Sequence, residues 1–429
     1  MRSHALLEEL RWRELLYQHT DGLADLLNDD VVSGYVGFDP TATSLHVGNL
    51  LAIMLLVHLQ HAGHRPVALA GGGTGLIGDP SGRKSERALM TTEEVESNTR
   101  AIAKQLERFL DFSGARSARL VDNAEWLTKL GAIEFMRDVG KHFTVNYMLQ
   151  KESVSARMDE GISYTEFSYM LLQSYDYLEL FRRYGVKLQM GGSDQWGNIT
   201  AGIELIRRTD GGVAHALTAP LVTTASGAKF GKSEGNAVWL DPRQTSPYAF
   251  YQFWMHVDDR DIGRYLRFFT LMPRATITDL DVATKDEPEK REAQQLLARD
   301  VTARVHGVEG LRAAEEVTGF YFGAREPTSL SNEAFEILRT ESPFAEVDPT
   351  EVSVDGDATR LDVIRMLVRS GLADSNGAAR RLLQQGGVSI NKRKLGPDER
   401  AVAASEALLT GRHVIVGKGK RDYALLRVR

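Results

Sequence analysis

The sequence contains no cysteine, which excludes disulfides, thiolate metal sites and cysteine nucleophiles together. It also lacks a long apolar run, because the longest, residues 50–57, spans eight residues where a membrane-crossing helix needs about 20. The first residues contain no apolar signal core, and the acidic pair Glu8 and Glu9 argues against a transit peptide. We therefore expect a cytoplasmic protein with no membrane partner.

Length and charge indicate a globular chain of several domains. The 429 residues exceed what one hydrophobic core usually serves, and 42% hydrophobic with 26% charged residues excludes disordered, collagen-like and coiled-coil chains. Residues 357–429 carry 15 basic and 7 acidic side chains, a net of +8, so the remainder carries a net of −14. A basic module on an acidic body favours a nucleic-acid partner over a chance drift of charge.

Hydrophobic spacing predicts a doubly wound α/β fold for residues 1–220. A helix is expected over 6–27, and a strand over 31–38 is followed by a helix over 48–61 and a strand over 66–70. A later strand over 186–190 runs into two glycines and precedes a helix over 199–208. Strand, helix and strand at this spacing predict a parallel, Rossmann-like sheet.

The rest of the chain divides into three further regions. Residues 221–323 contain a loop and then a helical pattern, which predicts an α-helical domain. Residues 324–356 are rich in Pro, Ser, Thr, Asp and Glu and predict a linker with at most one short helix, 332–338. Residues 357–429 predict a small α/β domain, with helices over 361–370 and 375–385 and strands over 388–390, 414–416 and 423–426.

Two glycine-rich strings match nucleotide-binding patterns only in part. Residues 73–78 fit G-x-G-x-x-G after a strand, but a turn follows where that fingerprint requires a helix. Residues 227–233 resemble a Walker loop, but three residues separate the glycines where four are needed. A nicotinamide enzyme and a P-loop ATPase are therefore disfavoured.

Two other short motifs point to phosphate chemistry. His46-Val47-Gly48-Asn49 stands where the loop after the first strand enters a helix, so that backbone N–H groups, His46 and Thr41 can meet phosphate oxygens. Far downstream, residues 229–233 place Lys229 and Lys232 three apart in a glycine-containing loop. Each motif alone also fits a structural histidine or a solvated basic turn, but the pair indicates a nucleotide site.

The two motifs resemble the His-x-Gly-His and Lys-Met-Ser-Lys-Ser signatures of class I aminoacyl-tRNA synthetases. Essentially the whole chain resembles the bacterial tyrosyl-tRNA synthetases, most specifically over residues 35–42, 75–82, 165–169, 191–198 and 229–233. Asn49 replaces the second histidine of the first signature, and its side chain still has an N–H to donate to a ribose oxygen. Phe230 and Gly231 replace Met and Ser in the second, a variant familiar in tyrosyl enzymes.

The resemblance implies a binding site for L-tyrosine. Tyr35 and Asp176 would contact the phenolic hydroxyl, Asp79, Tyr169 and Gln173 would hold the α-ammonium group, and Gln195 would lie near the carboxylate. Independently of the resemblance, the i, i+4, i+7 spacing of residues 169, 173 and 176 puts three polar side chains on one face of a helix expected over 165–181. A solvated helix face would show the same spacing. Groups built for a hydroxyl are left unpaired by phenylalanine. Tyrosyl-tRNA synthetases are the established example of that effect, with a known discrimination of about 10⁵.

For ATP, the resemblance implies a second set of residues. They are Asp39, Thr41, His46, Gly48 and Asn49 along the nucleotide, Gly191, Gly192 and Asp194 at the ribose, and Arg83, Lys229, Lys232 and Ser233 at the phosphates. Thr41, His46, Asn49, Lys229 and Lys232 are the expected catalytic residues. The tyrosine carboxylate, already ionised, would attack the α-phosphorus and expel pyrophosphate, so that positioning and charge neutralisation suffice. We expect Mg²⁺ with the ATP and no dedicated protein metal site.

The basic module over 357–429 resembles an RNA-binding domain shared with a small-subunit ribosomal protein. The side chains expected to face phosphates are Arg380, Arg381, Lys392, Arg393, Lys394, Lys418, Lys420 and Arg421. Such contacts are largely independent of sequence and sensitive to salt. By the same resemblance, the partners are a tRNA for tyrosine and a second copy of the chain, with the dimer interface on the first domain and no DNA.

Two alternatives stay open from the sequence. An enzyme of the same fold could activate tryptophan, although Tyr35 with Asp176 suits a hydroxyl better than an indole. A repurposed RNA-binding protein could have lost activation, although RNA binding alone needs neither His46 and Asp194 nor the two signature lysines. The sequence favours a tyrosine–tRNA ligase.

Overall fold

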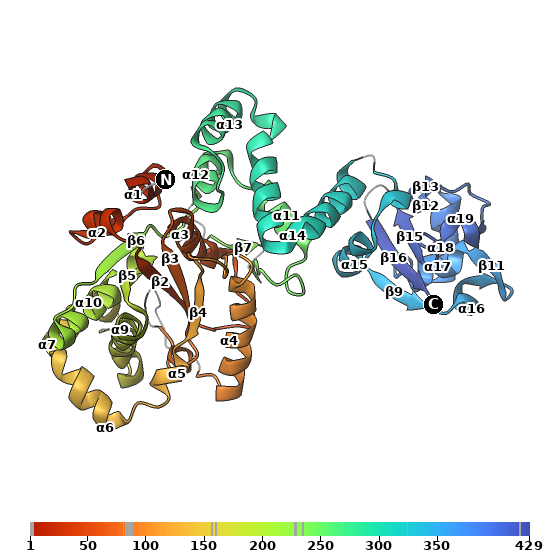
Figure 1. Cartoon of the computed structure of the whole chain (residues 1–429). Coiled ribbons are helices and arrows are strands. Elements are labelled where there is room, and N and C mark those ends of the chain that lie inside the picture. Colours follow the sequence, from red (N-terminus) through yellow and green to blue (C-terminus); the bar gives the residue numbers. More distant parts are fainter. Residues whose placement is uncertain are drawn as a thin grey trace. The chain divides into compact units, whose positions relative to one another are not determined.

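The computed structural model describes residues 4–79, 81, 89–155, 158, 161–226, 230–233, 236–323, 325–419 and 422–429. The chain forms two compact units, of which one comprises Met1–Asp241 with Met255–Val301 and the other Pro242–Trp254 with Thr302–Arg429. Figure 1 labels the helices and strands of both units. Among the described helices, none is long and apolar enough to cross a bilayer.

The first unit is built on a six-stranded sheet in the order β1-β6-β5-β2-β3-β4. Its strands are β1 (Gln18–His19), β2 (Ser33–Phe38), β3 (Arg65–Ala70), β4 (Arg119–Asp122), β5 (Val186–Gly192) and β6 (His215–Ala219). All neighbours are parallel except β1, which pairs antiparallel with β6. Strands β3 and β4 lie on one side of β2, whereas β5 and β6 lie on its other side. Ligands of open parallel sheets bind at such a switch point, outside the carboxyl ends of the strands.

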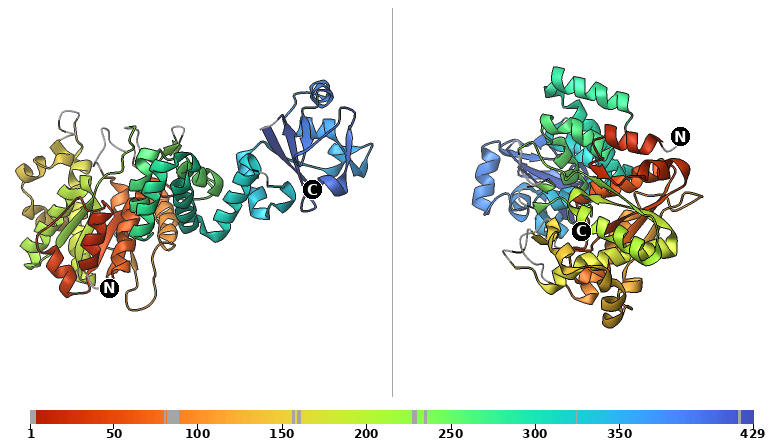
Figure 2. Two further views of the ribbon diagram at one scale, coloured as in Figure 1. Left: turned by 90° about the horizontal axis from the view of Figure 1, so that it is seen from above. Right: turned by 90° about the vertical axis from the view of Figure 1, so that its left-hand side faces the viewer.

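Helices cover both faces of this sheet, as the sequence predicts (Figures 1 and 2). Right-handed crossovers that run in opposite directions from β2 require this arrangement. On one face, Tyr35 shares a core with Tyr177 and Leu205 of α9 and α10. On the other, a Cβ at Gly34 would lie 2.9 Å from Leu59 of α3. The helices are α1 (His4–Trp12), α2 (Leu23–Asp29), α3 (Leu50–His61), α4 (Thr92–Leu106), α5 (Ala124–Leu127), α6 (Ala132–Glu134), α7 (Val145–Leu149), α8 (Glu152–Ser155), α9 (Tyr164–Tyr184), α10 (Trp196–Asp210), α12 (Asp259–Phe269) and α13 (Arg274–Asp286).

The predicted helix over 6–27 is wrong. The structure has two helices, α1 and α2, separated by the short edge strand β1. Glu14 has a φ of 60°, which ends α1, and Gln18 and His19 pair with Thr218 and Leu217 of β6. A contact with a strand about 200 residues away therefore overrides the local apolar spacing.

The second unit contains a five-stranded sheet and a three-stranded sheet, in the orders β13-β12-β15-β16-β9 and β10-β11-β14. The strands are β9 (Phe344–Val347), β10 (Ser353–Val354), β11 (Asp357–Asp362), β12 (Val388–Ile390), β13 (Arg393–Lys394), β14 (Ala401–Ala403), β15 (His413–Lys418) and β16 (Asp422–Val428). The helices are α15 (Asn332–Glu341), α16 (Pro349–Val352), α17 (Val363–Arg369), α18 (Asn376–Gln384) and α19 (Ala404–Ala407). The two helices and three strands expected over 357–429 are all present.

The structure differs from the expected linker over 324–356. β9 pairs parallel with β16, and Phe335 and Leu338 of α15 share a core with Ile415 and Leu425. Pro343 stands directly before β9 and Pro349 is the first residue of α16, so the prolines that indicated a linker mark the starts of short elements.

The helical stretch predicted from the sequence forms α11 (Pro247–Met255), α12, α13 and α14 (Glu292–Phe322). Helix α14 is broken at Gly307, which has a φ of 77° that only glycine adopts readily. The two units divide these helices, with α12 and α13 in the first. The domain borders expected at 220, 323 and 356 therefore remain a proposal.

Candidate active site

Polar groups gather where β2, β3 and β5 end, at the switch point of the sheet. Asp39 follows β2, and its two carboxylate oxygens accept from the hydroxyls of Thr74 and Tyr169, each at 2.8 Å. Asp39 thereby connects the loops after β2 and β3 with α9. Gly71 permits this approach, because a Cβ there would lie 2.4 Å from a carboxylate oxygen of Asp39.

Helix α9 presents one polar face to this region. Ser163 caps its first turn by accepting from the N–H of Glu166, and Gly185, with a φ of 62°, ends it. Of the three predicted residues, Tyr169 and Asp176 are buried and Gln173 is half-buried. The predicted shared face is therefore present, and it points into the protein rather than into solvent.

Asp176 is the most firmly held of these groups. One carboxylate oxygen accepts from Trp126 Nε1 at 2.7 Å, and the other accepts from Asn123 Nδ2 at 2.8 Å. Burial raises the pKa of Asp176 to about 8, against the lowering effect of those two donors. Asn123 and Trp126 were not predicted from the sequence, because β4, the strand that ends just before them at the carboxyl edge of the sheet, was not predicted either.

Tyr35 lies on β2 beside Asp176, with its ring edge-on to Tyr177 at 5.3 Å between centroids. Its hydroxyl is buried and has no hydrogen-bond partner among the described residues, and the same is true of the side-chain oxygen of Gln189, its register partner on β5. Burial, followed by the charge of Asp176, raises the pKa of Tyr35. An unpaired buried polar group costs about 1–3 kcal/mol, so these two groups on neighbouring strands indicate a binding site next to Tyr35 and Asp176. Gln189 was missed, and its place inside the apolar run 186–190 was the signal.

A chain of side-chain amides joins the predicted ammonium and carboxylate groups. Asn198 Nδ2 donates to Gln173 at 3.0 Å, Gln173 Nε2 donates to Gln195 at 3.2 Å, and Gln195 Nε2 donates to Asp79 at 2.7 Å. The chain fixes the orientation of each amide and ends on a carboxylate, which suits a cationic ligand. Asn198 was not predicted, although it lies one turn after Gln195 on α10.

The first signature forms a short turn at the start of α3. His46 caps the turn Val47–Asn49. Its ring Nδ1 accepts from the backbone N–H of Gly48 at 3.0 Å, and the backbone N–H of His46 donates to Asn49 Oδ1 at 3.0 Å. The backbone N–H of Gly48 is thus already bonded, which differs from the expectation that it is open to phosphate. The side-chain oxygen of Asn49 is an acceptor here, which leaves its NH₂ as the donor end. Thr41 is exposed in the loop after β2.

Backbone hydrogen bonds join the two signatures. The N–H of Val47 donates to Val238 at 2.9 Å, and the N–H of Val238 donates to Gly231 at 3.0 Å. Gly231 has a φ of 83°, and a Cβ there would lie 2.9 Å from a methyl group of Val47. The predicted pairing of the signatures is present in the backbone. Arg83 and Lys229 lie outside the described residues, as do the side chains of Lys232 and Ser233 on β7 (Lys232–Ser233), which pairs with β8 (Asn236–Ala237).

The predicted ribose residues end β5. Gly191 and Gly192 are its last residues, and a Cβ at Gly192 would lie 2.6 Å from a carboxylate oxygen of Asp194. Asp194 is exposed in the turn that leads into α10. These residues stand at the same edge of the sheet as Asp39, as the resemblance implies.

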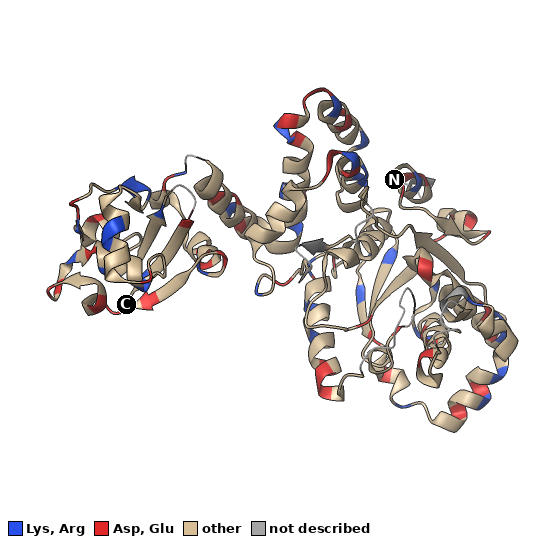
Figure 3. Ribbon diagram, turned by 180° about the vertical axis from the view of Figure 1, so that it is seen from behind, with Lys and Arg blue, Asp and Glu red and all other residues tan. Residues whose placement is uncertain are grey.

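The predicted RNA-facing cations divide into two groups. Arg380, Arg381 and Lys394 are exposed, and Figure 3 shows basic segments over several elements of the second unit. The others are engaged: Lys392 Nζ lies 4.7 Å from the ring of Phe320, Arg393 pairs with Glu399 at 2.7 Å, and Lys418 Nζ donates to the carbonyl of Leu372 at 3.3 Å. Lys420 and Arg421 lie outside the described residues. Among the side chains that the structure describes, no group of three His, Asp or Glu is placed to hold a metal ion.

Two family models match the chain. The one described as "tRNA synthetases class I (W and Y)" covers residues 28–322, and the one described as "Tyrosine--tRNA ligase SYY-like C-terminal domain" covers residues 341–426. The tyrosine–tRNA ligase of Roseiflexus castenholzii is 52% identical over 426 residues, 99% of each chain. That of Bacillus caldotenax is 50% identical over 98% of this chain and 99% of its own.

Solved structures agree with this assignment. A C-terminally truncated mitochondrial tyrosyl-tRNA synthetase of Coccidioides posadasii is 32% identical with a TM-score of 0.63, over 72% of this chain and 90% of that one. A tryptophanyl-tRNA synthetase from Encephalitozoon cuniculi, 14% identical over 71% of this chain and 87% of its own, has a TM-score of 0.54 and shares the fold alone. The chain therefore belongs to the class I tRNA synthetases for tryptophan and tyrosine, and within them to the bacterial-type tyrosyl-tRNA synthetases.

Proposed function

We propose that the chain activates L-tyrosine with ATP to tyrosyl-adenylate and pyrophosphate, and then transfers tyrosine to the 3′-terminal ribose of its tRNA. The observation that carries the tyrosine site is the buried Asp176, fixed by Asn123 and Trp126 beside the unpartnered hydroxyl of Tyr35. A ligand hydroxyl can pair with both, whereas the indole N–H of tryptophan can only donate. Phenylalanine would leave the hydroxyl of Tyr35 unpaired.

The amino-acid end of the substrate would lie along the amide chain. Asp79, Tyr169 and Gln173 offer a carboxylate, a hydroxyl and an amide oxygen to the α-ammonium group, and Gln195 offers its amide N–H₂ to the carboxylate. Because Gln195 donates to Asp79 at 2.7 Å in the ligand-free chain, binding exchanges this bond for bonds to the substrate. The exchange keeps every polar group paired, which lowers the cost of binding.

In the first step, an oxygen of the tyrosine carboxylate forms a bond to the α-phosphorus, and the bond from that phosphorus to the pyrophosphate oxygen breaks. No proton moves, so the residues act by position and charge. We assign the nucleotide to Asp39, Thr41, His46, Gly48 and Asn49, its ribose to Gly191, Gly192 and Asp194, and the leaving pyrophosphate to Arg83, Lys229, Lys232 and Ser233. In the second step, the oxygen of a ribose hydroxyl of the tRNA forms a bond to the tyrosyl carbonyl carbon, the bond from that carbon to the phosphate oxygen breaks, and the hydroxyl proton leaves with the phosphate of AMP.

The finer assignments follow from the same proposal. Mg²⁺ would enter with the ATP, bound to the phosphate oxygens, because it prefers such hard oxygen ligands and is commonly bound through substrate phosphates. We also propose a cytoplasmic homodimer that contacts its partner through the first unit, where Ile133, Met136, Val145 and Tyr164 are each more than half exposed. Sedimentation would then give twice the mass of one chain.

ATP–pyrophosphate exchange with each amino acid in turn, without tRNA, tests the proposed reaction. Exchange with tyrosine, and little with phenylalanine or tryptophan, is the expected result. Exchange with another amino acid would overturn the substrate, and no exchange with any would leave an RNA-binding protein.

Tyrosine binding is expected to weaken as the pH falls below 8. Because the pKa of Asp176 is about 8, its carboxyl holds a proton at lower pH. The phenolic hydroxyl of the substrate donates to the ionised form, so binding expels that proton and becomes less favourable by up to about tenfold per pH unit. Equilibrium dialysis with tyrosine from pH 6 to pH 9 measures the effect. A dissociation constant that does not change below pH 8 would contradict this prediction.

A further inference from the structure

Helix α12 binds the chain on the upstream side of the second signature. Asp261 Oδ2 accepts from the backbone N–H of Ala225 at 2.8 Å. Arg264 donates to the carbonyl of Thr223, which also accepts from the hydroxyl of Tyr265 at 3.3 Å. Arg264 and Asp261 lie 3.2 Å apart, so that the two side chains and the backbone of residues 223–225 form one hydrogen-bonded cluster.

The same helix contacts the downstream side of the segment. Phe230 is buried, stacks on Phe269 with 5.5 Å between ring centroids, and stands edge-on to Tyr265 at 5.1 Å. Tyr265 therefore touches residues on both sides of positions 227–229. Helix α12 thus contacts the chain before and after the part of the sequence that begins the signature.

These contacts hold residues 223–225 against α12. Thr223 and Ala225 are exposed, and with residues of α12 they line an open cleft of about 590 Å³. Asp261, by contrast, is only 4% exposed. A carboxylate is costly to bury unless it is paired. Asp261 has two such partners: Ala225, which belongs to this segment, and Arg264, which donates to the carbonyl of Thr223 in the segment.

The opposite end of α12 is fixed as well. Arg13 is buried and donates to the carbonyls of Arg267, Thr270 and Met272 at 3.1, 2.8 and 2.8 Å. These carbonyls belong to the last turn of α12 and the residues after it, which otherwise lack helical partners. Helix α12 is therefore held at its carboxyl end and has the signature segment bound along its length.

We propose that Asp261 and Arg264 are positioning residues for the second signature, through which α12 sets the place from which the signature meets the leaving pyrophosphate. This inference rests on the proposed function. Neither side chain touches the substrate. A displacement of about 1 Å in a charge-neutralising group is enough to lower the rate of the chemical step without changing amino-acid binding.

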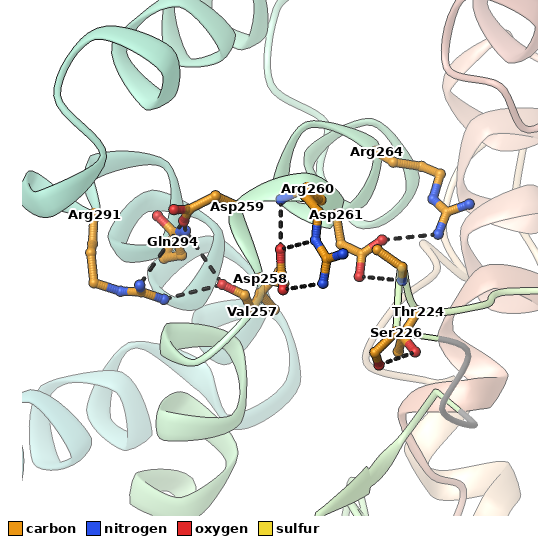
Figure 4. Close-up of polar contacts among 11 residues, drawn as sticks. Thr224, Ser226, Val257, Asp258, Asp259, Arg260, Asp261, Arg264, Arg291 and Gln294 are labelled. Carbon is orange, nitrogen blue, oxygen red and sulfur yellow. Dashed lines mark hydrogen bonds and ion pairs between the residues drawn. The ribbon is translucent and has the colours of Figure 1, made fainter.

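Asp259 provides a matched control on the same turn. Figure 4 shows that Asp258, Asp259 and Asp261 follow one another on the chain but bind different partners. Asp259 is exposed and accepts from Gln294 Nε2 at 2.6 Å, on α14, whereas Asp261 accepts from Ala225. Removal of Asp259 thus deletes a carboxylate of α12 and leaves residues 223–225 bound.

The test is the single-turnover rate of tyrosyl-adenylate formation by the full-length chain, with tyrosine affinity measured separately by equilibrium dialysis. Asp261→Ala is expected to lower this rate by about tenfold to hundredfold, with tyrosine affinity within about twofold. Asp261→Asn keeps an acceptor oxygen for Ala225 and should recover part of the rate. Asp259→Ala should retain the full rate.

A second measurement separates positioning from general stability. If Asp261 acts through the signature, Asp261→Ala should have a smaller effect in a chain that already carries Lys232→Ala, because residues that act as a unit are not additive. Additive losses would overturn the inference. So would an unchanged rate in Asp261→Ala, or, should that variant fold poorly, an unchanged rate in Arg264→Gln. Absence of tyrosine-dependent activation in the unaltered chain would overturn the proposed function and this inference with it.

Discussion

Replacement of Asp176 by asparagine is expected to lower kcat/KM for tyrosine activation by about 100-fold or more. Both oxygens of Asp176 accept hydrogen bonds, from Trp126 Nε1 and Asn123 Nδ2. An asparagine has one oxygen and one NH₂, so one of these donors would face another donor in a buried site. Loss of a buried hydrogen bond to a charged group costs about 1.5–3 kcal/mol, and the substrate hydroxyl loses its acceptor as well. Pyrophosphate exchange at varied tyrosine concentration measures the loss.

The control for this variant lies on the same helix. Glu179 is one turn further along α9, and its carboxylate pairs with Arg183 at 2.6 Å and with Arg182 at 3.8 Å. Glu179→Gln should therefore retain tyrosine activation, although the pair contributes some stability. The preference for tyrosine over phenylalanine, measured as the ratio of their kcat/KM values, gives a second readout. Asp176→Asn should lower this ratio by a larger factor than it lowers the affinity for ATP. An Asp176→Asn chain that activates tyrosine at the original rate would show that the phenol is read elsewhere.

β2, β3 and β5 could be predicted from the sequence because each is a short, mostly apolar stretch that stops at Asp39-Pro40 or at glycines. Strands buried on both faces have this pattern irrespective of their neighbours. β1 and β9 could not be predicted, since each is short and gains its hydrogen bonds from a distant partner, β6 or β16. Pairing of that kind leaves no local periodicity to detect.

The site divides in the same way. Tyr169, Gln173 and Asp176 could be placed on one face because helical spacing is a local property, and the resemblance then supplied the ligand. Asn123 and Trp126 could not, since they lie about 50 residues before Asp176 and reach it only through the order of the strands. The orientation of the amide chain from Asn198 to Asp79 likewise depends on the meeting of α9 with α10, which contact each other in the folded unit.

Charge reversal of both Arg380 and Arg381 to glutamate is expected to weaken tRNA binding by about tenfold to hundredfold at low salt and to leave adenylate formation unchanged. Both side chains are exposed on α18, and neither forms an ion pair with any residue that the structure describes. They are therefore available to phosphates, unlike Lys392 on Phe320 and Arg393 on Glu399. Each lost phosphate contact removes about one unit from the slope of log affinity against log salt concentration.

The control is an equal change of charge elsewhere in the second unit. Arg312 and Arg339 are about half exposed and pair with Glu333 and Glu336. Their double reversal adds the same negative charge to the same unit, so a general electrostatic effect would weaken tRNA binding equally in both variants. A specific site on α18 requires a larger loss and a shallower salt slope for Arg380→Glu with Arg381→Glu alone. Equal losses would instead assign tRNA affinity to the net charge of the unit, because the long-range field does not depend on which basic residues are reversed.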